Sequence, residues 1–299
     1  MGAFAFQIES LWVASDNVNV DGARVLDVKN YDLAFVLLAG GQSARYGGNK
    51  LLSEHPISKL PLIEHSLRVL LDAKASHSVA LINSAVTKTT NQERLAKQSR
   101  VTVVAGKWHG SIDSHLRGLP VNVVHNTLWE EGIASSIRAG LKHVLSTPTL
   151  PPFSFTCAPE DDLESDERSD TKNEESAGDT KPPSHVLISL ADLACLTEQD
   201  MANLIHASQA NPENIVCCEW QNNKERGQGG HDSHPRLTVP AIFPNAMFTE
   251  LLSLKGDVGA KPVISEYLKK GRVTTVPTPN AQFDIDSPQD WVTVALSSH

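Results

Sequence analysis

The stretch LAFVLLAGGQSARYGGNK, residues 33–50, decides the fold of this 299-residue chain. Its first seven residues are apolar throughout, which is typical of a strand covered on both faces of a sheet. Four glycines, a serine, an arginine and a lysine stand within the next eleven residues. Glycines let backbone N–H groups converge on anionic oxygens, while Arg45 and Lys50 supply positive charge. The stretch therefore predicts a buried strand that runs into a polyphosphate-binding loop.

Two other phosphate-binding loops are excluded by the same residues. Lys50 is followed by Leu51 rather than by Ser or Thr, so the loop is not a Walker loop. Its glycines also lack the Gly-x-Gly-x-x-Gly spacing of dinucleotide-binding folds.

Further along the chain, short apolar runs alternate with patterns of helical period. We expect strands at 33–39, 101–105, 121–125, 185–190, 215–218 and 273–276. We expect helices at 61–71, 135–145, 197–208, 247–252 and 261–269. Thr197 with Asp200 is typical of a capping box, and Ser287 before Pro288 predicts another helix start. This alternation predicts an α/β fold of three layers, with a mostly parallel sheet wrapped by helices. In such sheets ligands bind at the carboxyl ends of the strands.

The charge of the chain is concentrated in one segment. The net charge is −9, and residues 160–181 carry −7 of it. The nearly neutral remainder argues against nucleic-acid binding through a basic face. No apolar run approaches the roughly 18 residues of a membrane span, so no membrane partner is expected. Four cysteines without a Cys-x-x-Cys motif, and no signal peptide, favour reduced thiols in the cytoplasm.

The domain organisation follows from the same composition. Residues 1–30 are interpreted as an N-terminal extension, and residues 31–299 as one domain. Residues 151–184 are acidic, contain two Pro-Pro pairs and have few apolar residues, so we interpret them as a disordered insertion within that domain.

The phosphate loop resembles that of nucleotidyltransferases of the Rossmann-like nucleotide-diphospho-sugar transferase type. More narrowly, it is similar to the loop of enzymes that attach a nucleotide to molybdopterin, the MobA-like family. In that family the loop wraps a nucleoside triphosphate, and its Arg and Lys contact the phosphates. By this resemblance the nucleotide-binding residues are Ala39, Gly40, Gly41, Ser43, Arg45, Gly47 and Lys50.

Further blocks resemble the molybdenum cofactor cytidylyltransferases of this family, in the same order. They lie at 125–141, 189–194, 239–244, 256–261 and 283–290. Two departures stand out: Thr127 replaces a usual Pro, and Ala194 replaces the Pro of the strand-ending Asp-x-Pro. The second departure predicts a looser turn but leaves Asp192 in place.

Three acidic residues are candidates for a Mg²⁺ site. Asp192 follows the predicted strand 185–190, so its carboxylate should emerge at the ligand edge of the sheet. Asp284 and Asp286 are two residues apart, so both point to one face of an extended segment. Hard carboxylate oxygens facing a phosphate loop suit Mg²⁺, with phosphates and waters completing its octahedron. Asp286 has a competing interpretation as a cap of the last helix, and the choice between Asp284 and Asp286 stays open.

Other residues receive weaker predictions. Asn126, Ser135 and Arg138 are candidate substrate-binding residues from the second matched block. Ser135 opens a predicted helix and also has a capping interpretation. Trp129 has two interpretations, stacking on a pterin or anchoring a turn. His231 and His234 are interpreted as part of a mobile loop rather than as a zinc site.

The resemblance implies an enzyme that transfers CMP from CTP to molybdopterin with Mg²⁺ and releases pyrophosphate. Arg45, Lys50 and Asp192 are then the catalytic residues, and a molybdoenzyme or its chaperone is a possible partner. The Leu-Ala-Gly-Gly form of the loop is the one found in guanylyl-transferring relatives, so GTP stays open as the nucleotide. Another phosphorylated acceptor, or a non-catalytic cofactor-binding maturation protein, also stays open.

Overall fold

The first strand fixes the centre of the molecule. In the computed structural model, which describes residues 31–84, 101–147, 182–221 and 235–296, all seven residues of β1 (Leu33–Ala39) are buried. Alternate side chains of β1 enter two separate apolar cores, with Phe35 and Leu37 in one and Val36 and Leu38 in the other. The predicted strand covered on both faces is confirmed, because a continuous apolar run supplies a core on either side.

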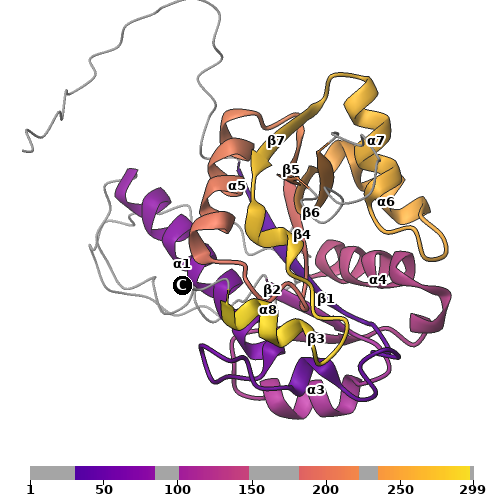
Figure 1. The fold of residues 1–299 in the computed structure, drawn as a ribbon. Helices are drawn as coiled ribbons and strands as arrows, with labels where there is room; N and C mark the ends of the chain where they lie inside the picture. Colours follow the sequence, from indigo (N-terminus) through magenta and orange to yellow (C-terminus); the bar gives the residue numbers. More distant parts are fainter. Residues whose placement is uncertain (1–30, 85–100, 148–181, 222–234, 297–299) are drawn as a thin grey trace, which may run out of the picture. The chain divides into compact units, whose positions relative to one another are not determined.

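Helices cover both faces of the sheet, so the three-layer prediction is confirmed. α1 (Leu62–Ser84), α3 (His109–Leu116), α5 (Glu198–Ala210) and α8 (Asp290–Leu296) pack on one core. α4 (Ile133–Ser146), α6 (Phe248–Ser253) and α7 (Lys261–Lys269) pack on the other. Figure 1 shows α1 and α5 on one side of the sheet and α4, α6 and α7 on the other. Short 3₁₀ helices occur at η2 (Lys50–Leu52), η3 (Trp129–Glu131), η5 (Asn245–Met247) and η6 (Pro279–Gln282).

The sheet described by the structure has seven strands in the order β3-β2-β1-β4-β6-β5-β7. The other strands are β2 (Val101–Ala105), β3 (Asn122–His125), β4 (His185–Leu190), β5 (Ile215–Trp220), β6 (Arg236–Pro244) and β7 (Val273–Pro277). β6 runs antiparallel to both its neighbours, and the remaining pairs are parallel, so the mostly parallel sheet is confirmed.

Strand register aligns the ends of four strands at one edge. Ala39 pairs with Ala105, Ala105 pairs with His125, and Leu38 pairs with Leu190. The chain passes from β1 outward through β2 and β3, and then returns to place β4 on the other side of β1. The order of strands therefore reverses between β1 and β4, where the loops diverge and open α/β sheets bind ligands.

Some sequence predictions need correction. β6 and α3 were not among the predicted elements, and the start predicted at Ser287-Pro288 is wrong because α8 begins at Asp290. The Asp290 carboxylate instead accepts the backbone N–H groups of Asp286 and Ser287. The capping box of Thr197 and Asp200 is confirmed.

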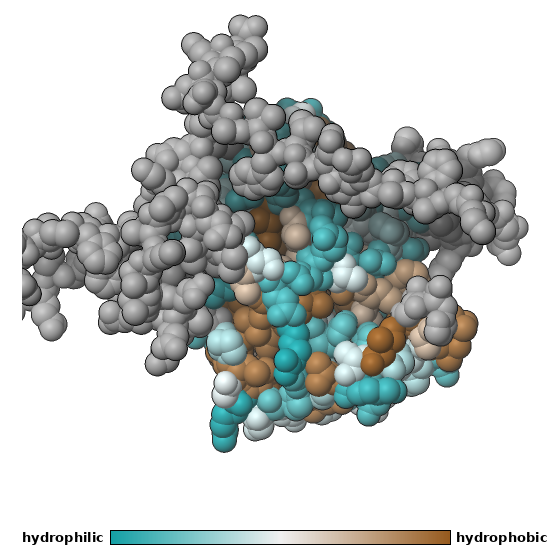
Figure 2. Space-filling view, turned by 90° about the vertical axis from the view of Figure 1, so that its left-hand side faces the viewer, coloured by the Kyte–Doolittle hydropathy of each residue, from teal (hydrophilic) through white to brown (hydrophobic). Residues whose placement is uncertain are grey.

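Parts of the sequence analysis lie outside the described residues. These are the predicted extension at residues 1–30, most of the predicted insertion at 151–184, and His231 with His234. No helix among the described residues is long and apolar enough to cross a membrane. On the face seen in Figure 2, hydrophilic and hydrophobic residues are interspersed rather than gathered in one apolar surface.

Candidate functional site

The loop after β1 is open to a ligand. A Cβ atom added at Gly41, Gly47 or Gly48 would meet no heavy atom within 4 Å. Gly47 has a φ of 77°, a conformation that L side chains rarely adopt. Backbone N–H groups in such a loop remain approachable by anionic oxygens. The geometry is consistent with the predicted polyphosphate-binding loop.

Two aromatic anchors hold this open loop in place. Trp291 of α8 donates its indole N–H to the Tyr46 hydroxyl at 2.9 Å, and that hydroxyl donates to Ser53 Oγ at 2.7 Å. Trp108, just after β2, donates its indole N–H to the carbonyl of Gln42 at 3.4 Å. These anchors were not predicted, because residues so far apart in sequence carry no shared motif.

Lys50 lies at the centre of the site, directly on the acidic residues. Its ammonium Nζ is 2.7 Å from Asp192 Oδ2, 3.6 Å from Asp286 Oδ1 and 2.5 Å from the carbonyl oxygen of Ile285. The residue is 8% exposed, so this cation is largely shielded from water. A buried ammonium is stable only when acceptors surround it, and the two carboxylates supply most of that compensation.

Arg45 extends the charged cluster toward solvent. Its guanidinium is 3.0 Å from Asp286 Oδ2, and the Arg45 side chain is 78% exposed. An ion pair this exposed contributes about 0–1 kcal/mol, so little energy is needed to turn Arg45 toward a phosphate.

The segment with Asp284 and Asp286 lies beside the turn with Asp192. Ile285 N–H donates to the carbonyl of Asp192 at 3.0 Å, and Leu193 forms an antiparallel bridge with Asp284. The pKa of Asp284 is raised by desolvation, and further by the nearby carboxylates of Asp192 and Asp286. Asp284 is still an exposed residue, so the shift carries little energy. The structure thus brings the three candidate acids beside the Arg45 and Lys50 side chains.

The acids fit a divalent cation. Asp192 Oδ1 is buried and has no hydrogen-bond partner among the described residues, although Oδ2 binds Lys50. A buried carboxylate oxygen without a partner is costly, and a hard cation is the ligand that would satisfy it. Across the described ranges no group of three or more His, Cys, Asp or Glu side chains is arranged to hold a metal by itself. A cation here would therefore depend on phosphate and water oxygens for its remaining ligands.

Asn126 organises the buried start of α4. Its Nδ2 donates to Ser135 Oγ at 2.8 Å and to Ser136 Oγ at 3.0 Å, while its Oδ1 accepts the N–H of Leu128. Asn126 and both serines are 3–4% exposed. Ser136 lies against Gly40, since a Cβ at Gly40 would come within 2.4 Å of Ser136 Oγ. This buried cluster packs against the start of the phosphate loop at Gly40.

Arg138, a predicted substrate-binding residue, has two protein partners in the structure. One of its guanidinium nitrogens donates to Glu131 Oε2 at 2.6 Å, and another donates to the carbonyl of Leu254 at 2.5 Å. The first contact ties α4 to η3, and the second ties α4 to the residue that follows α6. Trp129 packs closely on Gly106, where an added Cβ would lie 2.6 Å from Trp129 Cβ.

The two adjacent cysteines of β5 have thiols of low acidity. Cys217 and Cys218 are buried in β5, and burial raises the pKa of both thiols to about 12. Thiols this weakly acidic stay protonated at neutral pH, so both side chains act as packing groups of the strand.

Comparisons with known proteins agree with this arrangement. A family model for the MobA-like NTP transferase domain matches residues 35–271. The chain belongs to this family. No curated protein matches the sequence.

Solved structures show the same fold for this MobA-like chain. A nucleotidyl transferase from Methanothermobacter thermautotrophicus is 15% identical with a TM-score of 0.53, covering 90% of this chain and 99% of that one. A 4-diphosphocytidyl-2C-methyl-D-erythritol synthase from Anaerococcus prevotii is 13% identical with a TM-score of 0.54, covering 90% and 100%. The family match supports nucleotidyltransferase-type activity on a nucleoside triphosphate.

Proposed function

We propose that this chain is a Mg²⁺-dependent cytidylyltransferase that moves CMP from CTP to molybdopterin. The observation that carries the proposal is the position of the phosphate loop. The loop follows β1, at the point where strand order reverses between β1 and β4. Lys50, at its end, forms ion pairs with both Asp192 and Asp286.

In the proposed reaction a terminal phosphate oxygen of the acceptor attacks the α-phosphorus of the nucleotide. That P–O bond forms while the bond between the α-phosphorus and the bridging oxygen breaks, and pyrophosphate leaves with the electron pair. Lys50 and Arg45 would neutralise the charge that grows on the pyrophosphate. Asp192, with Asp286 or Asp284, would hold the Mg²⁺, which offsets phosphate charge when bound. Positioning and charge neutralisation are then the main work of the protein.

The choice of CTP over GTP rests on sequence blocks that meet in space. Ala134 N–H donates to the carbonyl of Gly256 at 3.2 Å, and Ile133 N–H donates to Asp257 Oδ1 at 3.3 Å. The blocks at 125–141 and 256–261, both of which resemble the cytidylyl branch, therefore form one surface. Gly40, which pointed to GTP, has a packing reason instead, because Ser136 fills the space that a methyl group would need.

Pyrophosphate release tests the proposal. Purified protein with Mg²⁺ and molybdopterin should release pyrophosphate from CTP, and much less from GTP, ATP or UTP. Release that prefers GTP would replace the cytidylyl assignment with the guanylyl one. No release with any nucleotide, while a known molybdopterin cytidylyltransferase is active in the same assay, would contradict the proposed acceptor. The Asp192→Asn variant is the matched control for a contaminating activity.

A further inference from the structure

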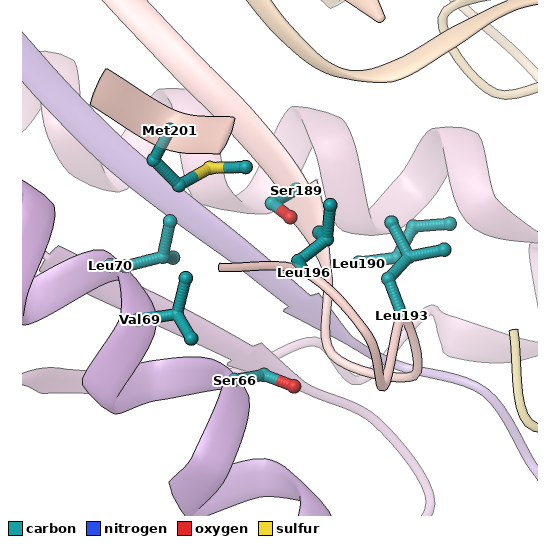
Figure 3. Close-up of a pocket in the computed structure, with 8 residues that line it drawn as sticks. All are labelled: Ser66, Val69, Leu70, Ser189, Leu190, Leu193, Leu196 and Met201. Atoms are coloured by element: carbon teal, nitrogen blue, oxygen red, sulfur yellow. The ribbon is translucent and has the colours of Figure 1, made fainter. Parts of the chain in front are cut away.

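The turn that carries Asp192 is buried, and its Leu193, Ala194 and Leu196 belong to the apolar core that α1 covers. Beneath it lies a small cavity of about 10 Å³, close to the volume that one water molecule needs. Leu193 and Leu196 of the turn line the cavity together with Val69 and Leu70 of α1 (Figure 3). Side chains that border a void lose contacts on that side, so hydrogen bonds add to core packing in holding the turn.

Ala194 makes two of these hydrogen bonds, one from each side of its backbone. Its N–H donates to the carbonyl of Phe283 at 3.0 Å, a bond that the Pro usual at this position could not form. Its carbonyl oxygen is 3.0 Å from His55 Nε2. Hydrogen bonding at Ala194 therefore replaces the stiffness that a proline ring would give the turn.

The geometry around His55 determines which ring nitrogen carries the proton. Nδ1 lies 3.3 Å from the N–H of Ile57 and 3.2 Å from the N–H of Ser58, both of which can only donate. Nδ1 is therefore the acceptor, and the proton resides on Nε2, which donates to the carbonyl of Ala194. His55 is a neutral side chain whose two nitrogens both have partners.

The imidazole is held rigidly by its surroundings. His55 is 2% exposed, and its ring stacks on His65 with centroids 4.0 Å apart and an interplanar angle of 16°. Trp291 lies nearly perpendicular to the His55 ring, with ring centroids 5.7 Å apart and an interplanar angle of 88°. Its backbone is tied in the loop between η2 and α1, where His55 N–H donates to the carbonyl of Leu60. One side chain thus joins the segment after Lys50 to the turn after β4.

We infer that His55 is a positioning residue for the Asp192 carboxylate, acting through the carbonyl of Ala194. This inference rests on the proposed function for the role of Asp192 in metal and nucleotide binding. Without the Nε2–H bond, the turn over the cavity shifts, and Asp192 no longer faces the phosphate loop at the distance that Lys50 and a cation require. Supporting groups behind a metal ligand typically change metal affinity by about 10–100-fold.

Two substitutions distinguish the hydrogen bond made by His55 Nε2 from those made by His55 Nδ1. In His55→Gln the amide nitrogen takes the place of Nε2 and keeps a donor for Ala194. In His55→Asn the amide oxygen takes the place of Nδ1, so the acceptor for Ile57 and Ser58 stays while the donor to Ala194 is lost. Both variants lose the ring and its stacking on His65, so a general packing defect affects them alike.

The assay is Mn²⁺ affinity of the nucleotide-free protein, measured by the loss of the free-ion electron spin resonance signal. His55→Asn should weaken Mn²⁺ binding about tenfold relative to His55→Gln, and its KM for the nucleotide should rise in parallel. Equal Mn²⁺ affinity of the two variants, or a larger loss in His55→Gln, would overturn the inference.

Hydrogen–deuterium exchange gives a second readout that needs neither metal nor turnover. Amides of residues 191–196 should exchange faster in His55→Asn than in His55→Gln, while β1 exchanges alike in both. Uniform acceleration over the whole chain would assign His55 a structural role only and refute positioning. If the unaltered protein binds no Mn²⁺, the metal part of the proposed function fails, and the exchange experiment still decides the role of His55.

Discussion

Substituting Gly40 by Ala tests whether the phosphate loop is packed as the structure shows. The new methyl carbon would lie 2.4 Å from Ser136 Oγ and 3.4 Å from Ser136 Cβ. Carbon and oxygen atoms in contact are normally separated by about a further ångström, so the hydroxyl must move. Ser136 Cβ is already at an ordinary contact distance and can stay in place.

The energetic cost follows from what the hydroxyl leaves behind. Ser136 Oγ accepts one of the two N–H bonds of the buried Asn126 side chain, at 3.0 Å. Moving it leaves a buried amide donor unsatisfied, which costs about 1–3 kcal/mol in the free energy of unfolding. Ser136→Ala removes the same acceptor and should cost about the same. Gly40→Ala added to Ser136→Ala should cost little more, because the clashing atom is already gone.

Urea unfolding of the four proteins measures these free energies by linear extrapolation, with the slope m checked for constancy. The two losses should be strongly non-additive, with a coupling energy of about 1–3 kcal/mol, as expected for residues in contact. Additive losses would refute the packing argument, and so would a Gly40→Ala protein as stable as the unaltered chain. In either case Gly40 would again point to the nucleotide base rather than to Ser136.

Four further outcomes are expected. Asp192→Asn should reduce turnover by orders of magnitude in the pyrophosphate assay, and retained turnover would remove Asp192 from the site. The same variant should lower the free energy of unfolding by about 1–3 kcal/mol, because the ammonium of Lys50 loses its nearest charged partner. Lys50→Met should tighten Mn²⁺ binding to the nucleotide-free protein about tenfold, since no ammonium then competes for the acids. Titration calorimetry measures the Mn²⁺ affinity, and an unchanged affinity would contradict the placement of Lys50. Burial and, to a smaller extent, the neighbouring His55 lower the pKa of His65 to about 4, below its ordinary value near 6.5. The unfolded chain then binds the proton more tightly, so stability that is present above pH 6.5 should be lost as the pH falls toward 4. Urea unfolding of a His65→Asn control should show a shallower dependence of stability on pH. Deleting residues 160–181 should leave both the melting temperature and turnover nearly unchanged, because a loop without apolar anchors alters closure entropy only weakly, whereas a large loss of either would show that the segment contacts the domain.

Strand β6 was not predicted from the sequence. Its residues 236–244 contain Pro240 and Pro244, and proline argues against an inner strand. In the structure β6 lies between β4 and β5, and the pairing steps from Cys217 with Ala241 to Cys218 with Thr238. Val239 and Pro240 fall in this irregularity, so the missing N–H of proline costs no ladder bond. An interruption of this kind depends on the partner strand, which local sequence does not reveal.

The sequence by itself determined the layered fold and predicted the glycine-rich loop after β1 as a phosphate-binding loop. An unbroken apolar strand followed by glycines is a local pattern, because side-chain alternation and glycine freedom act over a few residues. It also determined which acids follow strands. The tertiary structure alone decided that Lys50 and Asp192, 142 positions apart, share a hydrogen bond of 2.7 Å. The physical reason is strand order. Only when β4 pairs beside β1 do their carboxyl ends meet at one edge and place the buried Lys50 ammonium beside Asp192.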